Sequence, residues 1–261
     1  MQCLMPLVNV PMIEYTLEFL AKEGVQQIFI VSCSHASIIE EYLNQSIWMK
    51  KSSKLKVQIV RAEHAFSVGD ALRQVDSLGE IQGDFVLISG DVISNIKLEQ
   101  VLKAHKYDSY SSIHPFISLH SQKNNQLPLH HHNISSHNCL ITLSLFLAHT
   151  PHTHTHTHTY THIPFPRARV QEDKHNIMTI VMKKATPSHR TRSLDDELVV
   201  VLDEQNNRIM YFDDSQEQRS VSINIANFEE HPRIQFRHDL LDCHIDICTP
   251  EVRAPVWSDA S

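Results

Sequence analysis

Asp91 is the residue whose type and position could support chemistry most directly. It follows Gly90 at the end of the run 84–89, whose apolar residues are typical of a buried strand. A carboxylate at the end of such a strand could hold a divalent cation, because hard cations prefer oxygen ligands. An aspartate at a strand end is also a common turn residue. We favour this structural interpretation and keep the cation-binding one as its alternative.

Gly69 is the second candidate, within the stretch 67–71. A glycine lets a backbone approach a ligand closely. The same stretch also has the composition of a helix start, with Asp70 as a favourable acid in the first turn. Gly69 and Asp91 are therefore predicted as vestigial cofactor-binding positions at most. We assign no catalytic residue, no metal site and no cofactor.

Histidine and cysteine are unusual here but do not form a recognisable site. Twelve of the 20 histidines lie between residues 107 and 166, and they could bind transition metals without any fold. The 5 cysteines are scattered and no Cys-x-x-Cys occurs, which favours a reducing compartment over disulfides or zinc. No Ser/His/Asp or Cys/His arrangement stands out.

The elements that would position Gly69 and Asp91 alternate at short spacing in residues 1–106. Apolar periodicity predicts four helices, and β-rich apolar runs predict three strands between them. This order implies crossover connections, a mostly parallel sheet, and ligand sites beyond the carboxyl ends of strands. Ser34 is the candidate N-cap of the second helix. The predicted helices are 11–22, 34–44, 67–75 and 98–105, and the strands are 27–33, 56–61 and 84–89.

Residues 107–166 differ from the rest of the chain. They contain one acid, one base and the alternation PHTHTHTHTYTH, and they have no helix or strand period outside the apolar run 139–148. A CA dinucleotide repeat read in frame encodes alternating His and Thr. We interpret this block as a low-complexity insertion derived from an intron, and we expect it to be disordered.

Residues 167–252 again have the patterns of folded protein. Strands are predicted at 176–183, 198–203, 208–212, 221–225, 233–237 and 241–248, with a hairpin turn at Asn206-Asn207. Cys243 and Cys248 are five apart in a strand-like run, so they should face opposite sides of it. Residues 253–261 offer no strand or cap and are interpreted as a truncated tail.

Composition excludes several classes of protein. The 261 residues are 41% hydrophobic and 20% charged, which is typical of a globular chain. The net charge of −7 argues against direct nucleic-acid binding. Because the longest strongly apolar stretch is about half of a membrane span, we expect no membrane association and a cytosolic location.

Several strings resemble one family. The stretches PLVNVPMIEY (6–15), SGDVISNI (89–96), NIMTIVMKK (176–184) and LLDCHIDICTP (240–250) are similar to the epsilon subunit of eukaryotic translation initiation factor 2B, in its N-terminal nucleotidyltransferase-like domain. The resemblance implies an α/β Rossmann-like fold with a mixed or parallel sheet flanked by helices. In relatives the helix that ends near Lys106 runs almost directly into the strand that begins at Asn176, so the resemblance and the composition place the insertion at the same junction. We therefore divide the domain into 1–106 and 167–252.

The resemblance also implies a function and its limits. In the family the complex exchanges guanine nucleotide on initiation factor 2, and the partners would be the other 2B subunits, gamma especially, and initiation factor 2. The exchange domain, a β-helix and a Gly-rich loop before Pro6 are expected in the family and are not in this sequence. In related sugar nucleotidyltransferases an Asp at the position of Asp91 holds Mg²⁺ against the nucleotide phosphates. A sugar-nucleotide pyrophosphorylase and a non-functional gene-model product are the alternatives.

Overall fold

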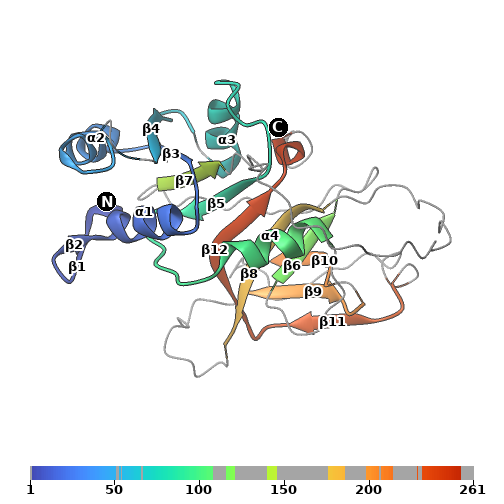
Figure 1. Ribbon diagram of the computed structural model, residues 1–261. Coiled ribbons are helices and arrows are strands. Elements are labelled where there is room, and N and C mark those ends of the chain that lie inside the picture. Colours follow the sequence, from blue (N-terminus) through green and yellow to red (C-terminus); the bar gives the residue numbers. More distant parts are fainter. Residues whose placement is uncertain are drawn as a thin grey trace, which may run out of the picture.

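The computed structural model describes residues 2–50, 53, 55–65, 67–107, 116–120, 140–145, 176–185, 198–205, 207–213, 228 and 231–253. Its centre is a seven-stranded mixed sheet with the strand order β4-β3-β7-β5-β12-β8-β6 (Figure 1). The seven strands are β3 (Gln27–Ser32), β4 (Lys56–Arg61), β5 (Phe85–Ser89), β6 (Phe116–His120), β7 (Leu140–Leu145), β8 (Asn176–Lys184) and β12 (Leu240–Cys248).

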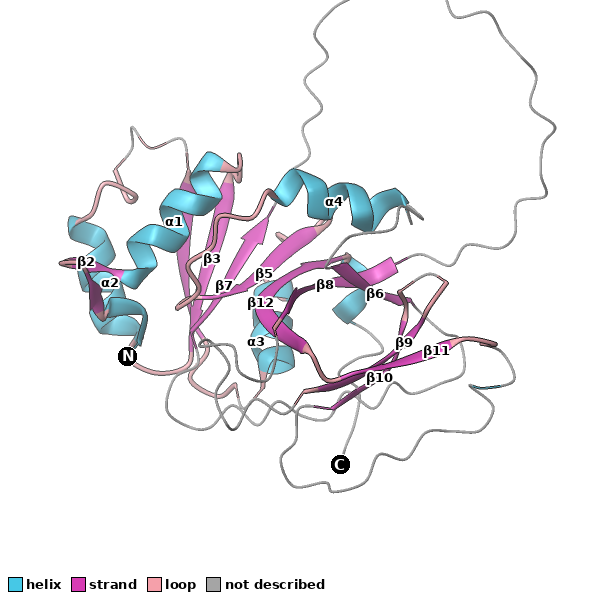
Figure 2. Cartoon of the chain, turned by 90° about the horizontal axis from the view of Figure 1, so that it is seen from below, coloured by secondary structure: helices cyan, strands magenta, loops and turns pink. Residues whose placement is uncertain are grey.

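Helices cover both faces of this sheet. Figure 2 shows α1 and α4 on one face and α3 on the other. The α3 face is also covered by a small antiparallel sheet with the order β10-β9-β11, which shares a hydrophobic core with α3. The helices are α1 (Met12–Lys22), α2 (Ala36–Gln45), α3 (Val68–Asp76) and α4 (Leu98–Tyr107), and the small sheet is β9 (Val199–Asp203), β10 (Ile209–Asp213) and β11 (Ile234–Arg237). Two short 3-10 helices, η1 (Gln2–Leu4) and η2 (Pro250–Arg253), complete the elements together with the hairpin strands β1 (Pro6–Leu7) and β2 (Val10–Pro11).

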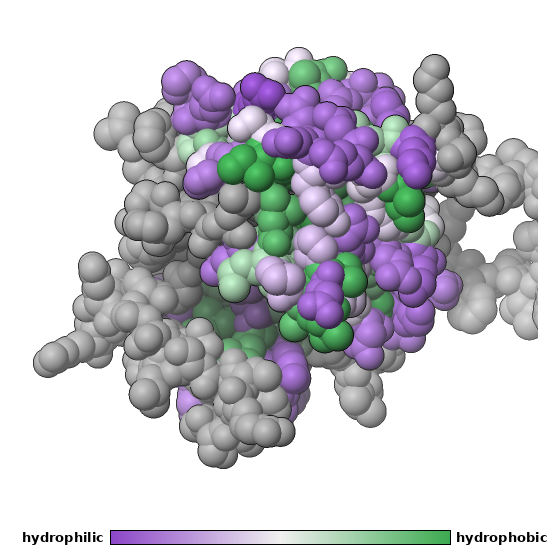
Figure 3. Space-filling model, turned by 90° about the vertical axis from the view of Figure 1, so that its left-hand side faces the viewer, coloured by the Kyte–Doolittle hydropathy of each residue, from purple (hydrophilic) through white to green (hydrophobic). Residues whose placement is uncertain are grey.

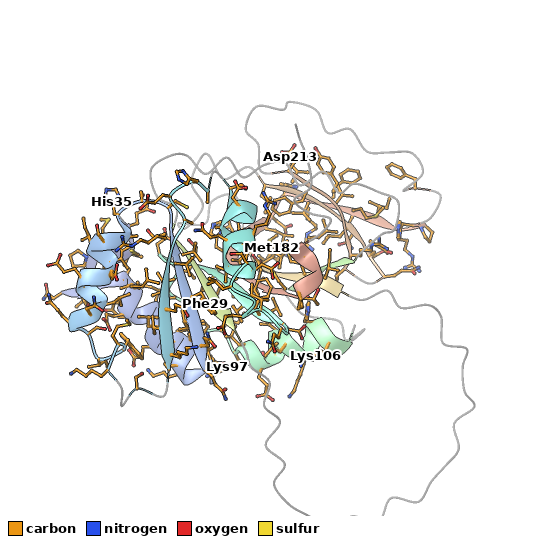
Figure 4. The ribbon with its side chains drawn as sticks, turned by 90° about the horizontal axis from the view of Figure 1, so that it is seen from above. Phe29, His35, Lys97, Lys106, Met182 and Asp213 are labelled. Atoms are coloured by element: carbon orange, nitrogen blue, oxygen red, sulfur yellow. The ribbon has the colours of Figure 1, made fainter. Side chains whose placement is uncertain are left out.

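Two hydrophobic cores lie on opposite faces of the large sheet. One joins α1, α2 and α4 to the sheet, and the other joins α3 and the small sheet to it. Cys243 packs against the first core and Cys248 lies in the second, so the predicted alternation along this strand is confirmed. Figure 4 shows Phe29 and Met182, both of the second core, inside the molecule.

Side-chain hydrogen bonds connect α1 with α2 and the segment that follows α2. Glu14 Oε1 accepts a hydrogen bond from the Tyr42 hydroxyl at 2.9 Å, and Glu14 Oε2 accepts one from Trp48 Nε1 at 2.6 Å. Burial and the adjacent Glu14 carboxylate raise the pKa of Tyr42 to about 12. This carboxylate therefore has partners on both oxygens and serves the fold.

The N-terminal hairpin exposes apolar side chains. Its turn places Val8 and Asn9 at φ 51° and 67°, in the left-handed region that a β-branched residue such as Val8 rarely adopts. Val8 is 82% exposed, and Met5, Leu7 and Val10 are exposed as well. In Figure 3, which shows the side of the molecule that carries the N-terminal elements, hydrophobic areas stand between larger hydrophilic ones.

Two predictions about elements are wrong. Ser34 is not the N-cap of α2: His35 takes that place with φ 61°, and Ser34 instead accepts a hydrogen bond at its carbonyl from Ser32 Oγ at 2.6 Å. The sheet is not mostly parallel, because β3–β4 is its one directly parallel pair among the described strands. The strand predicted at 221–225 lies outside the described residues.

Two segments of the block 107–166 are strands among the described residues, and one of them lies within the apolar run 139–148, while the expected disorder of the block stays a prediction. Phe116–His120 forms the edge strand β6 beside β8, and Leu140–Leu145 forms β7 in the middle of the sheet. The physical reason is that uncharged, apolar runs pair readily with strands that present unsatisfied backbone groups. The boundaries of the insertion and its intron origin stay predictions.

Candidate functional site

The candidate site lies at the carboxyl ends of β3, β4 and β5, where ligands bind in α/β sheets. β3 and β4 are directly parallel, and β3 and β5 are both antiparallel to β7 and so run the same way. Their carboxyl ends therefore meet at one edge. The loops that leave this edge carry Asp91 after β5 and lead into α3 after β4, which places Gly69 near the same edge.

Asp91 is half-buried and engaged with its own turn. Ser89 Oγ donates a hydrogen bond to Asp91 Oδ1 at 2.6 Å, and the amide of Val92 bonds to the Ser89 carbonyl at 3.2 Å. The Val92 carbonyl in turn accepts from Thr16 Oγ1 of α1 at 2.9 Å. These bonds are what the turn interpretation requires, and they tie the loop to α1.

Cys3 lies near this carboxylate. Burial, and to a smaller extent the charge of Asp91, raise the pKa of the Cys3 thiol to about 11. A thiol with this pKa is protonated at neutral pH, so it is a poor nucleophile there. Cys3 of the short helix η1 is buried in the same hydrophobic core against which Val92, the residue after Asp91, packs.

Gly69 and Asp70 belong to the first turn of α3. Ser67 and Asp70 form a capping box, in which Asp70 N donates to Ser67 Oγ at 3.1 Å and Ser67 N donates to Asp70 Oδ2 at 3.0 Å. Arg73 pairs with the same carboxylate, so the acid is used for helix capping and a surface ion pair. Gly69 is buried within this turn. These contacts are the ones that the helix-start interpretation of this stretch requires.

Asp246 is a partly buried residue with one shielded carboxyl oxygen, and the sequence analysis does not identify it. It lies on β12 between Ile245 and Ile247, and its Oδ1 is shielded from solvent without a hydrogen-bond partner among the described residues. Burial, followed by the charge of Asp242, raises the pKa of Asp246 well above the ordinary value. The signal in the sequence is an acid that has the same alternating phase as Cys248 on an apolar strand.

The structure does not bring Asp91 and Asp246 together as a metal site. Asp246 is level with Leu87, two residues before the end of β5, whereas Asp91 lies beyond that end, in the turn closed by the hydrogen bond from Val92 N to the Ser89 carbonyl. Among the described residues no group of three or more His, Cys, Asp or Glu side chains could hold a metal ion. The described residues therefore offer no all-protein metal cluster, and no chemical step is assigned to a metal ion. The same residues include no helix long and apolar enough to cross a membrane.

Comparison with known proteins agrees with this fold. The nucleotidyl transferase family matches residues 1–125. Translation initiation factor eIF2B subunit epsilon of Dictyostelium discoideum is 36% identical over 251 residues, and the subunit of the same name from Schizosaccharomyces pombe is 34% identical over 254. The two alignments cover 96% and 97% of this chain. The resemblance to the epsilon-subunit family is confirmed.

The chain matches only part of the length of the two epsilon subunits. The chain covers 27% of the Dictyostelium protein and 28% of the Schizosaccharomyces protein. The predicted nucleotidyltransferase-type α/β fold is confirmed by the family match together with the mixed, helix-covered sheet. The assignment of Gly69 and Asp91 as vestigial cofactor-binding positions stays a prediction.

Proposed function

We propose that this chain acts as the nucleotidyltransferase-like part of an initiation factor 2B epsilon subunit. Its role is architectural and regulatory within the complex that returns GDP-bound initiation factor 2 to its GTP form. The observation that carries this proposal is the similarity to two epsilon subunits over nearly the whole chain. The site supports it as well, because the polar groups around Asp91 and Gly69 are engaged in turn and helix-cap hydrogen bonds.

The proposed partners are other subunits of the 2B complex, gamma in particular, and initiation factor 2, in the cytosol. Exposed apolar side chains at the N-terminal hairpin are consistent with a domain that meets another protein. The chain is proposed to have no enzymatic activity alone, because no described group of side chains resembles a catalytic arrangement.

The decisive experiment is co-purification. Tagged chain co-expressed with the gamma subunit should retain gamma on the resin and elute with it in gel filtration. The same preparation should leave GDP release from purified initiation factor 2 unchanged. Circular dichroism of the tagged chain checks that it is folded. A folded chain that does not retain gamma would refute the proposed partner, and accelerated GDP release would refute the lack of activity.

A working sugar-nucleotide pyrophosphorylase is the second candidate, favoured by the nucleotidyl transferase match over residues 1–125. We expect titration calorimetry to show no Mg²⁺-dependent binding of a nucleoside triphosphate. Asp91→Ala and Glu41→Ala form a matched pair, since Glu41 is an exposed acid on α2, away from the candidate loops. Mg²⁺-dependent binding that disappears in Asp91→Ala and persists in Glu41→Ala would establish the enzyme instead.

A further inference from the structure

β4 is an edge strand of the large sheet. It is last in the strand order, it pairs with β3 in the parallel direction, and Figure 1 shows it at the side of the sheet next to α2. Every residue of β3 is buried, whereas β4 is partly exposed along most of its length. No strand among the described residues pairs with the outer edge of β4. An open strand edge is a template for pairing with another chain.

Hydrogen bonds at both ends of β4 show which of its backbone groups face outward. The backbone amides of Lys56 and Ala62 donate hydrogen bonds at 2.8 and 2.9 Å to carbonyls at the two ends of β3. Successive residues of a strand direct their backbone groups to opposite edges, so the even-numbered residues of this stretch face β3. The N–H and C=O groups of Val57, Ile59 and Arg61 therefore point away from the sheet.

The two ends of this outer edge are closed by side chains. The Arg61 carbonyl accepts a hydrogen bond from Gln74 Nε2 of α3 at 2.7 Å. At the other end, Leu55 N donates to the hydroxyl of a neighbouring serine at 3.2 Å. Within the described part of the chain, Val57 and Ile59 are left with outward backbone groups that no other group engages. The open part of the edge is therefore one short, central stretch.

This stretch is complementary to a second copy of itself. In an antiparallel ladder, two residues that face each other can exchange both of their backbone hydrogen bonds. Val57 of one copy can face Ile59 of the other, and the reverse pair then forms as well, with Gln58 of both copies on the two-fold axis. Val57 and Ile59 pack against the first core in each copy, so the two sheets would join with matching faces.

The charges on β4 agree with the same register. Residues 57–60 are uncharged, and Lys56 and Arg61 flank them. In the two-fold register Lys56 faces Val60 and Arg61 faces Leu55. Like charges that face each other across two strands are destabilising, and this register avoids them.

We propose that the outer edge of β4 is a dimerisation surface whose occupant is β4 of a second copy of this chain. The two strands pair in antiparallel fashion about a two-fold axis at Gln58 and join the two large sheets into one. The contact uses the same surface on both copies, so assembly stops at the dimer. The ladder is short, so we expect weak and reversible association. This inference goes beyond the proposed function and does not depend on it.

Sedimentation velocity of the full chain over a series of concentrations tests the proposal. We expect a reversible equilibrium between monomer and dimer. Gln58 is partly exposed, so the single chain can accommodate a charge there. Gln58→Lys places two ammonium groups face to face at the axis, and Gln58→Glu places two carboxylates there. Each variant alone should self-associate at least about tenfold more weakly than the unsubstituted chain, because like charges across an interface are strongly unfavourable.

Mixing the two variants tests the position of the axis. An equimolar mixture of Gln58→Lys and Gln58→Glu should regain the dimer, because residue 58 of one copy then meets the opposite charge on the other. Gln100→Lys and Gln100→Glu are the matched control pair, since Gln100 is exposed on α4, which packs against β8, β12 and β6. Both control variants should associate as the unsubstituted chain does. Circular dichroism checks that all four variants are folded.

Three results would overturn the proposal. The first is a chain that stays monomeric at every concentration. The second is a dimer that the charges at residue 58 do not weaken, or that the mixture of folded variants does not restore, because another surface would then form it. The third is a monomeric chain that loses gamma on the resin through Gln58→Lys but not through Gln100→Lys, because the edge would then serve a strand of a different protein.

Discussion

Leu143→Pro is expected to lower the free energy of unfolding of the protein by about 3 kcal/mol or more. If the remaining stability is too small, the cooperative unfolding transition of the large sheet should disappear. Leu143 is in register with Phe29 on one side and Leu87 on the other, so β7 has a ladder on both edges. A proline there removes a donor and places its ring against a neighbouring strand. Urea unfolding followed by circular dichroism measures the change in midpoint and slope.

Leu119→Pro is the matched control. Leu119 lies in β6, which is the last strand of the sheet and pairs only with β8 among the described strands. An edge strand tolerates proline better because one of its edges has no ladder to break. We expect a loss of about 1 kcal/mol, the typical contribution of one hydrogen bond. Equal losses in the two variants would show that Leu140–Leu145 does not form a central strand.

In the unsubstituted chain the free energy of unfolding should fall as the pH rises, and Asp246→Asn is expected to abolish this fall. Burial and the charge of Asp242 raise the pKa of Asp246 in the folded state, whereas the unfolded chain keeps the ordinary value of 3.8. Above that value the unfolded state gives up the proton while the folded state retains it. The folded state then binds more protons, so the free energy of unfolding falls as the pH rises.

The decline should continue until the pH passes the raised pKa and should then level off. Each pH unit between the two pKa values costs about 1.4 kcal/mol. The amide that replaces the carboxyl cannot ionise, so the variant should lack this slope and be more stable than the unsubstituted chain at neutral pH. Thermal unfolding at a series of pH values from about 4 to 8 measures the slope. Identical slopes in the two proteins would contradict the assigned burial of this carboxyl.

Asp242→Asn separates the two causes of the shift in pKa. The charge of Asp242 is the second cause, after burial, of the raised pKa of Asp246. Asp242 Oδ1 also accepts a hydrogen bond from the backbone amide of His244 at 2.7 Å. An amide keeps an oxygen for this bond while removing the charge. The pH dependence should therefore weaken but persist, because burial is the larger cause. A complete loss of the slope would make the charge of Asp242 the dominant cause.

Local sequence patterns predicted most elements of the first hundred residues. The strand predicted at 56–61 is β4 itself, and the helix predicted at 11–22 differs from α1 by one residue at its start. Both elements have a clear apolar period, and the helix also has Pro11 at its start and Gly24 just after its end, so short-range preferences are enough. Ser34 failed as a cap because its neighbour His35 adopts a left-handed backbone conformation, which the residue type does not reveal.

The candidate site was predicted only in part, for a related reason. Asp91 could be predicted as a turn residue because it follows an apolar strand. Its hydrogen bond with Ser89 is what such a turn requires. Asp246 was missed because alternation along β12 shows that it faces one side of the sheet but not how deeply that side is covered. Asp246 has the same phase along β12 as Cys248, whose core also contains residues of α3 and the small sheet, which are distant in sequence. Burial of this kind is a property of several segments together.

By itself the sequence determined the local elements, the change of composition at 107–166, and the family resemblance that the comparisons bear out. Only the tertiary structure decided that two runs inside that block become strands, one at the edge of the sheet and one at its centre. Local preference can indicate that LITLSL forms a strand, but its neighbours, direction and register depend on which backbone edges remain unpaired elsewhere. Those edges belong to β3 and β5, more than fifty residues away in the chain.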